Sequence, residues 1–194
     1  GNLLFPDYDS NNAYYDYTAM FNKAMEKSKT MGNAEIFVKS GVYYFTGSVY
    51  LNSGTNINAE AGKTAFVIKP NYQDKNGNPV DVTGFFTNPN LNETYLWYQG
   101  KISDIVFVVE GTHEAFKPTN SVKTIMDNLC NDKVNAVKNF ELFYRIRMKY
   151  STIDNIALSG FDAFMRWTFV DMLTRVTSVT VGPTRLVYYG VQTN

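Results

Sequence analysis

Five carboxylates could contribute acid–base chemistry to this chain. Hydrolysis of a glycosidic bond needs two carboxyl groups about 5 to 9.5 Å apart, one on each side of the bond. β-Elimination needs a base and a positive charge that stabilises a uronate, often a calcium ion or an arginine. The carboxylates are Asp104, Glu110, Asp154, Asp162 and Asp171. No sequence motif identifies two of these residues as a catalytic pair. The candidates for catalysis are Asp104, Asp154, Asp162 and Asp171, and the sequence does not decide whether the protein is an enzyme.

Aromatic side chains form a second group, because the C–H groups of a sugar pack on a flat ring while its hydroxyls bond to nearby Asn, Gln and Asp. Two stretches, 70–100 and 110–150, interrupt the regular pattern described below and are interpreted as insertions, which commonly carry binding residues. The candidates for carbohydrate binding are Trp97, Tyr98, Trp167, Tyr188 and Tyr189. The alternative for each ring is a place in the core or in a subunit interface.

His113 and Cys130 are each the single residue of their kind. A reactive thiol needs a polarising base nearby and the sequence shows none, so Cys130 is predicted to be a buried structural thiol on a helix within 121–130. Neighbours of His113 indicate neither a general base nor a metal ligand set, so we predict a surface loop residue. We therefore expect no metal site, unless the chain is a lyase that uses calcium.

An amphipathic helix is predicted over 16–31. Its apolar side chains recur with helical spacing and form one stripe, while Asn22 and the lysines and glutamate around it take the opposite face. The stripe consists of Tyr17, Phe21, Ala24, Met25 and Ser28. Asp16 can accept hydrogen bonds from the first free backbone N–H groups, and Gly32 can end the helix in a left-handed conformation.

Short strands separated by glycine-containing turns are predicted after the helix, from residue 35 onward. Two later segments, 153–158 and 176–181, share apolar residues at the first, fourth and sixth positions. The step from Ile153 to Val176 is 23 residues, and equal spacing would stack equivalent positions on one another. The same step places Asp162 over Arg185 and Asp154 diagonally from Arg175, which predicts two ion pairs between neighbouring coils.

The N-terminal third resembles the entrance of a parallel β-helix. Asp16, Thr18 and Ala19 match an Asp-x-Thr-Ala helix, and Gly41 and Tyr43 match a Pro-x-Gly-x-Tyr strand in which Lys39 stands at the usual proline position. This region is similar to the pectate-lyase-like superfamily, and in particular to its bacteriophage tailspike and preneck appendage members. The resemblance covers roughly the first seventy residues.

That resemblance implies an all-β fold, a right-handed single-stranded parallel β-helix with an N-terminal capping α-helix. Residues 1–34 would form an arm and the capping helix, and residues 35–194 the coils with insertions near 70–100 and 110–150. It also implies a homotrimeric virion component that contacts cell-surface polysaccharide, or alternatively a polysaccharide lyase or glycoside hydrolase. The adjacent Asp pair, Gly-His-Gly and Arg-Ile-Lys motifs of pectin hydrolases are absent from the sequence. A third reading is a secreted or cell-surface bacterial protein that binds sugar.

Composition limits the partner classes. The 18 basic and 18 acidic residues give no net charge and form no long run of one sign, which argues against a nucleic-acid partner or an anionic membrane surface. No apolar stretch approaches the roughly 20 residues of a membrane-spanning helix. A strand-like run, 186–191, lies close to the C-terminus, so we expect the chain to be part of a longer protein.

Overall fold

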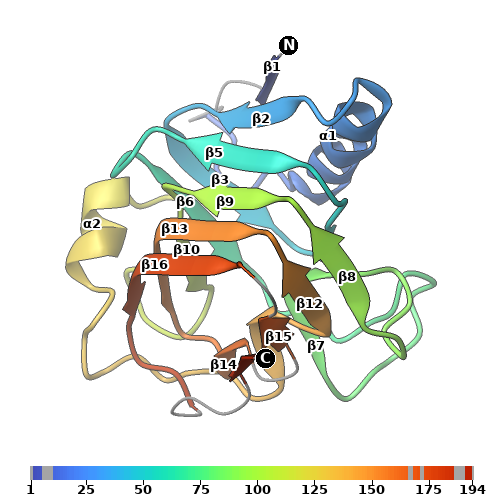
Figure 1. Ribbon diagram of the computed structural model, residues 1–194. Coiled ribbons are helices and arrows are strands. Elements are labelled where there is room, and N and C mark those ends of the chain that lie inside the picture. Colours follow the sequence, from blue (N-terminus) through green and yellow to red (C-terminus); the bar gives the residue numbers. More distant parts are fainter. Residues whose placement is uncertain (1, 6–10, 166–167, 171–172, 186–190, 194) are drawn as a thin grey trace.

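The computed structural model describes residues 2–5, 11–165, 168–170, 173–185 and 191–193. This part of the chain holds seventeen β-strands and two α-helices, α1 (Thr18–Thr30) and α2 (Val122–Asp127) (Figure 1). The strands form three sheets, and every strand pairs with its neighbours in parallel. The fold is therefore dominated by β-structure, as the sequence predicted.

The largest sheet has nine strands. One row of strands runs β1-β2-β5-β9 and a second runs β3-β6-β10; the long strand β13 pairs with both β9 and β10 and joins the two rows, and β16 then pairs with β13. The bounds are β1 (Asn2–Phe5), β2 (Glu35–Val38), β3 (Gly41–Phe45), β5 (Asn56–Ala59), β6 (Thr64–Ile68), β9 (Lys101–Ser103), β10 (Val106–Val109), β13 (Thr152–Ser159) and β16 (Arg175–Val181).

Two smaller sheets have four strands each. The first contains β4 (Val49–Tyr50), β7 (Thr83–Thr87), β11 (Phe140–Phe143) and β14 (Ala163–Met165). The second contains β8 (Tyr95–Tyr98), β12 (Ile146–Lys149), β15 (Thr168–Val170) and β17 (Val191–Thr193). Along the chain, strands of the three sheets follow one another in a repeated order. One such round of consecutive strands is called a pass below. Strands of one pass pair with strands of the next.

The predicted register between 153–158 and 176–181 is confirmed. Ile153 pairs with Val176, Ile156 with Val179 and Leu158 with Val181. The three residues of β13 are buried, and Val176 and Val179 pack against the same core. Val181 pairs with Leu158 as predicted and is 41% exposed. It lies at the end of β16, in the last pass with described side chains.

Equivalent positions of successive passes build the inner core. Ile36, Ile57, Ile102 and Ile153 lie in one register column, and none is exposed to solvent. A second column carries aromatic rings, and Phe66 meets the ring of Phe107 edge to face at 5.5 Å. Such columns bury apolar area continuously from one pass to the next, at roughly 25 cal/mol per Å².

Helix α1 covers the first pass, as predicted. It packs against β1, β2 and β4, and Phe21 is completely buried. The Phe21 ring lies edge-on to Phe45 at 5.8 Å and to Phe66 at 5.7 Å. Gly32 has φ +71°, in the left-handed region that the predicted helix end requires. The apolar stripe therefore faces the end of the inner core.

Asp16 fastens the start of α1 to the turn between β3 and β4. Its Oδ1 accepts hydrogen bonds from Thr18 N at 2.9 Å and from Thr46 N at 3.2 Å, and Oδ2 accepts from the Thr46 hydroxyl. Thr18 Oγ1 in turn accepts from Gly47 N at 3.0 Å. Asp16 thus accepts from the first backbone N–H group of α1, as predicted, and also connects the helix to the first pass.

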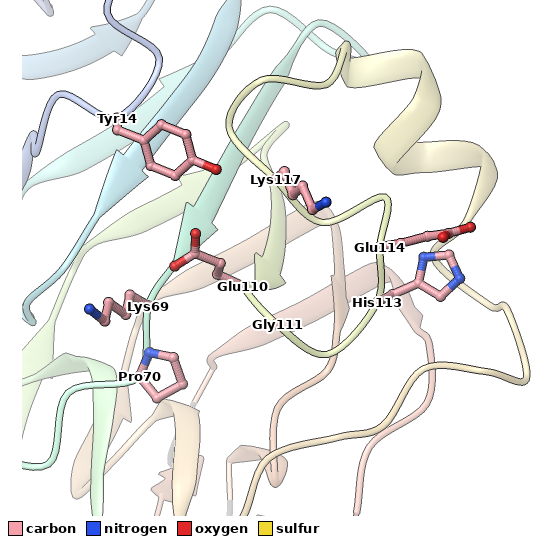
Figure 2. A pocket seen from close by; sticks show the side chains of 8 residues that line it. All are labelled: Tyr14, Lys69, Pro70, Glu110, Gly111, His113, Glu114 and Lys117. Carbon is pink, nitrogen blue, oxygen red and sulfur yellow. The ribbon is translucent and has the colours of Figure 1, made fainter.

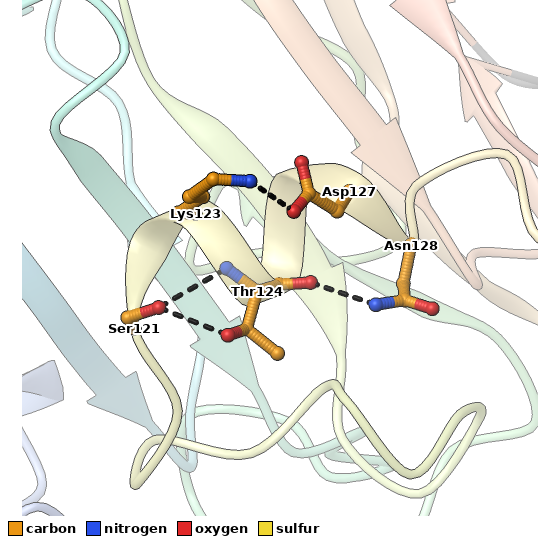
Figure 3. A network of polar contacts seen from close by, with 5 residues as sticks. All are labelled: Ser121, Lys123, Thr124, Asp127 and Asn128. Carbon is orange, nitrogen blue, oxygen red and sulfur yellow. Dashed lines mark hydrogen bonds and ion pairs between the residues drawn. The ribbon is translucent and has the colours of Figure 1, made fainter.

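The segment 110–139 leaves the sheets and covers the outer face of β3, β6 and β10. A second apolar cluster forms there, in which Val67 and Val108 of the sheet meet side chains of the insertion such as Phe116 and Ile125. Helix α2 is capped by Ser121, which accepts from Thr124 N at 3.1 Å (Figure 3). The same figure shows the ion pair of Lys123 with Asp127 and the hydrogen bond from Asn128 Nδ2 to Thr124 O at 2.9 Å.

Cys130 is exposed, so the prediction of a buried thiol is wrong. Helix α2 ends at Asp127, and the apolar contacts of this region are made by Ile125 and Leu129. Cys130 follows Leu129 and is not part of this apolar cluster.

The regions 70–100 and 110–150 contain regular strands as well as loops. Strands β7 and β8 lie within the first, and β11 and β12 within the second, all paired in register with neighbouring passes. The segments that leave the strands are 69–82, 88–94 and 110–139.

Candidate functional site

Asp104 and Asp154 lie together where neighbouring passes turn a corner. Asp104 has φ +66°, and its backbone N–H bonds to Asp154 O and Asn155 O. The carboxylate of Asp104 accepts from Asn155 Nδ2 at 2.8 Å, whereas that of Asp154 accepts from Thr177 Oγ1 at 2.8 Å. Asn155 and Ser178 continue the row of left-handed corners at φ +49° and +52°. Both carboxylates stabilise the stack, because each is held by a residue of an adjacent pass.

Asp162 is buried, with 1% exposure, and its Oδ2 accepts from Asn139 N at 2.7 Å. The predicted ion pair of Asp154 with Arg175 is wrong, because no ion pair joins these two described residues. The pairing of Asp162 with Arg185 stays a prediction. Asp154 instead accepts from the hydroxyl of Thr177, the residue directly opposite it in the register. Asp171 lies outside the described residues.

The aromatic candidates separate into core and surface. Trp97 is completely buried, and its Nε1 donates to Asn52 O at 3.2 Å. Gly100 sits against the indole so closely that an added Cβ would lie 2.2 Å from it. Trp97 therefore fills the core, the alternative considered for each ring, and its faces are covered. Tyr98 is 37% exposed and meets the Tyr150 ring edge to face at 5.4 Å.

Trp167, Tyr188 and Tyr189 lie outside the described residues, so their part in a sugar-binding set stays a prediction. Tyr98 alone of the five combines a described side chain with exposure.

A pocket of about 620 Å³ lies beside the insertion, at the carboxyl ends of β6 and β10. Lys69 and Glu110 directly follow the paired residues Ile68 and Val109, so the parallel register brings them to the same edge of the sheet. Figure 2 shows Glu110 with Tyr14 and Lys69 on one side, and the insertion loop across from it. The lining residues are Tyr14, Lys69, Pro70, Glu110, Gly111, His113, Glu114 and Lys117.

Tyr44 fixes the central carboxylate of this pocket. Its hydroxyl donates to Glu110 Oε2 at 2.8 Å, and its ring meets that of Tyr14 edge to face at 5.3 Å. Burial raises the pKa of Tyr44 well above its usual value, and the hydrogen bond and negative charge of Glu110 raise it further. Tyr44 is therefore a permanent proton donor to Glu110 at neutral pH.

The charged groups around Glu110 come from both sides of the pocket. Lys69 and Lys117 are exposed, and within the described part of the chain neither has an ion-pair partner. His113 lies in the loop, as predicted, and its Nδ1 accepts from Ala115 N at 3.1 Å. In the neutral imidazole the proton is therefore on Nε2.

Sequence reasoning had included Glu110 but had missed Tyr14, Lys69 and Lys117, and it gave His113 no role in a site. The sequence did contain one indication of this site, the position of Lys69 and Glu110 directly after two apolar strands. When such strands pair in parallel, the polar residues that follow them lie at the same edge of the sheet. What the sequence could not show is that the N-terminal segment and the insertion close the other sides.

A calcium ion would need several oxygen ligands gathered at one point. Over the described residues, no group of three or more His, Cys, Asp or Glu side chains is placed to hold a metal ion. Across the same residues, no helix is both long and apolar enough to span a membrane.

Comparison with known proteins gives no relative: no family model, no curated protein and no solved structure matches the chain.

Proposed function

We propose that this chain is a right-handed single-stranded parallel β-helix, capped by α1, from a bacteriophage tail spike or appendage, and that it contributes to recognition of host cell-surface polysaccharide. The observation that carries the proposal is the in-register parallel stacking of successive passes beneath a helix that begins with Asp16 and Thr18. A helix that covers one end of such a stack buries core side chains and backbone groups that would otherwise be exposed.

The contacts of Asp16 supply a physical reason for the resemblance at the N-terminus. The Asp-x-Thr pair bonds to the turn at Thr46 and Gly47, directly after the strand that carries Gly41 and Tyr43. The helix motif and the turn that follows the strand motif are therefore in direct contact. This contact supports the appendage reading, because the helix motif bonds to the turn that directly follows the strand of the second motif.

Polysaccharide recognition fits a stack of this kind because its rigid passes hold loops in fixed positions. The pocket at Glu110 offers an exposed ring, a fixed carboxylate and two lysines, a combination suited to the hydroxyls and charges of a sugar. We propose a homotrimer in the virion, since three copies would raise the avidity of weak individual contacts through effective concentration.

The test is binding of the purified 194-residue chain to a panel of immobilised bacterial surface polysaccharides, with its mass in solution determined by light scattering. Saturable binding to a subset of polysaccharides is expected, and a trimeric mass would support the assembly. A folded chain that binds none of the panel would contradict the recognition role.

A polysaccharide lyase or glycoside hydrolase is the second candidate. Glu110 favours it, because a carboxylate held by a tyrosine hydroxyl beside a pocket is a plausible acid–base group. Incubation with the bound polysaccharide, followed by assays for reducing ends and unsaturated uronate, separates the two functions. Cleavage that is lost in the Glu110→Gln variant would establish the enzyme, and binding without cleavage supports the receptor-binding role.

A further inference from the structure

We propose that the pocket at Glu110 binds one anionic unit of a saccharide, a sugar that carries a carboxylate or a phosphate. Tyr14 would pack on the sugar ring, Glu110 would accept hydrogen bonds from its hydroxyls, and Lys69 and Lys117 would attract its negative charge. This inference rests on the proposed function, polysaccharide recognition, and assigns the chemical class of the ligand to a particular site.

Tyr14 supplies the apolar surface. Tyr14 is 51% exposed, and one edge-to-face contact joins its ring to Tyr44, which is 7% exposed. A ring that is fixed from one side and open on the other loses little conformational freedom when a ligand packs on it. This arrangement suits the C–H face of a sugar.

Glu110 supplies the acceptor. Tyr44 occupies Oε2, and among the described residues Oε1 has no hydrogen-bond partner. The bond from Tyr44 orients the carboxylate, and Glu110 lines the pocket. A charge-assisted hydrogen bond from a sugar hydroxyl to this oxygen would be stronger than one to a neutral acceptor.

The lysines determine the sign of the ligand charge. Elsewhere on the surface, Lys63 pairs with Glu60 and Lys123 pairs with Asp127. Lys69 and Lys117 have no such partner in the described part of the chain, although the pocket also contains Glu110 and Glu114. Figure 2 shows them on opposite sides of Glu110. A sugar seated over Glu110 would therefore have an ammonium group near either edge, which favours an anionic substituent over an amino group.

The experiment is an NMR titration of the 194-residue chain with four monosaccharides: D-glucuronate, D-glucose 6-phosphate, D-glucose and D-glucosamine. We expect one or both anionic sugars to bind about tenfold more tightly than glucose, with shifts centred on Tyr14, Glu110 and Lys117. Comparison of glucuronate with glucose 6-phosphate identifies the carboxylate or the phosphate as the preferred group. Equal affinity for all four sugars, tighter binding of glucosamine, or shifts confined to other surfaces would overturn the proposal.

Variants assign the contributions. The double variant Lys69→Ala, Lys117→Ala should bind the anionic sugar as weakly as glucose and should lose the salt dependence of binding, because the attraction is electrostatic. Tyr14→Ala should weaken binding of all sugars. Lys133→Ala, an exposed lysine outside the pocket, is the matched control and should bind like the wild type. Unchanged affinity of the double lysine variant would overturn the assignment.

The two proposals can fail separately. If the chain binds a surface polysaccharide and none of the pocket variants changes that binding, recognition stands and the assignment of this pocket is wrong. If the pocket binds an anionic sugar and no polysaccharide in the panel binds, the ligand class stands and the proposed function is wrong.

Discussion

Strand β10 has a carboxylate beyond each end, and the two have different surroundings. Asp104 precedes the strand at a corner where neighbouring passes stack, and its carboxylate is held by Asn155 of the adjacent pass. Glu110 follows the strand where the segment 110–139 leaves the stack, and it lines a pocket. This difference shows that a carboxylate at a regularly stacked corner bonds to the adjacent pass. A carboxylate at a strand end next to an insertion can instead line a pocket that is open to a ligand.

The largest loss of stability is expected at α1, the helix that covers the first pass. Phe21→Asp would place a charge without compensation against Phe45 and Phe66, and should cost about 5 kcal/mol or prevent folding. Urea denaturation followed by circular dichroism measures the loss. A cost below about 0.5 kcal/mol would mean that this face of α1 does not cover the core.

Truncation within the stack comes next. Ile156→Ala should leave a cavity between the passes and cost about 2 to 5 kcal/mol, because Ile156 is 2% exposed. Thr177→Ala, on the exposed face of the neighbouring strand, should cost about 1 kcal/mol or less, the value of its bond to Asp154. Chemical denaturation of the two variants side by side gives both numbers. Equal losses would show that the register does not distinguish an inner from an outer face.

A smaller and pH-dependent effect is expected at Asp16. Burial raises the pKa of this carboxyl, but hydrogen bonds from Thr18 and Thr46 outweigh burial and leave the pKa below its ordinary value of 3.8. The ionised form is therefore favoured by folding, so the stabilisation is complete above the ordinary pKa and is lost as the pH falls through the folded value. Asp16→Ala should cost about 1 kcal/mol at pH 7.

Thermal unfolding at pH 7 and at pH 3 checks this sign. The gap between the wild type and Asp16→Ala should narrow at the lower pH. A gap that is constant or that widens on acidification would show that the ionised carboxylate is not the stabilising form.

The sequence predicted the parts of the fold that depend on local spacing. The stripe of α1 and the register of Ile153 with Val176 follow from periodicity, and the left-handed Gly32 follows from the residue type at the end of the helix. It did not predict that Trp97 is buried, because an alternating aromatic strand does not reveal which face meets the core. The exposure of Cys130 was missed because the apolar residues around it have helical spacing, although the helix ends at Asp127.

The candidate site was less accessible to sequence reasoning for a physical reason. Tyr14, Lys69 and Lys117 are far apart in the chain: pairing of β6 with β10 brings Lys69 beside Glu110, the ring of Tyr14 contacts Tyr44, and Lys117 comes from the insertion. No local pattern marks such a meeting. The carboxylates at the stacked corner, Asp104 and Asp154, looked equally suited to chemistry until their partners were known.

The most direct test of the comparison is one paired measurement, the free energy of unfolding and the affinity for an anionic sugar, on Asp104→Ala and Glu110→Ala. Asp104→Ala should lose about 1 to 2 kcal/mol, because it removes the bond from Asn155 and puts alanine at φ +66°, and should bind sugar like the wild type. Asp104→Asn, which tolerates that conformation, is its control. Glu110→Ala should lose about 1 kcal/mol, the value of its bond from Tyr44, and should bind the sugar about tenfold more weakly. Unchanged affinity of Glu110→Ala, or affinity lost in Asp104→Ala, would contradict the account.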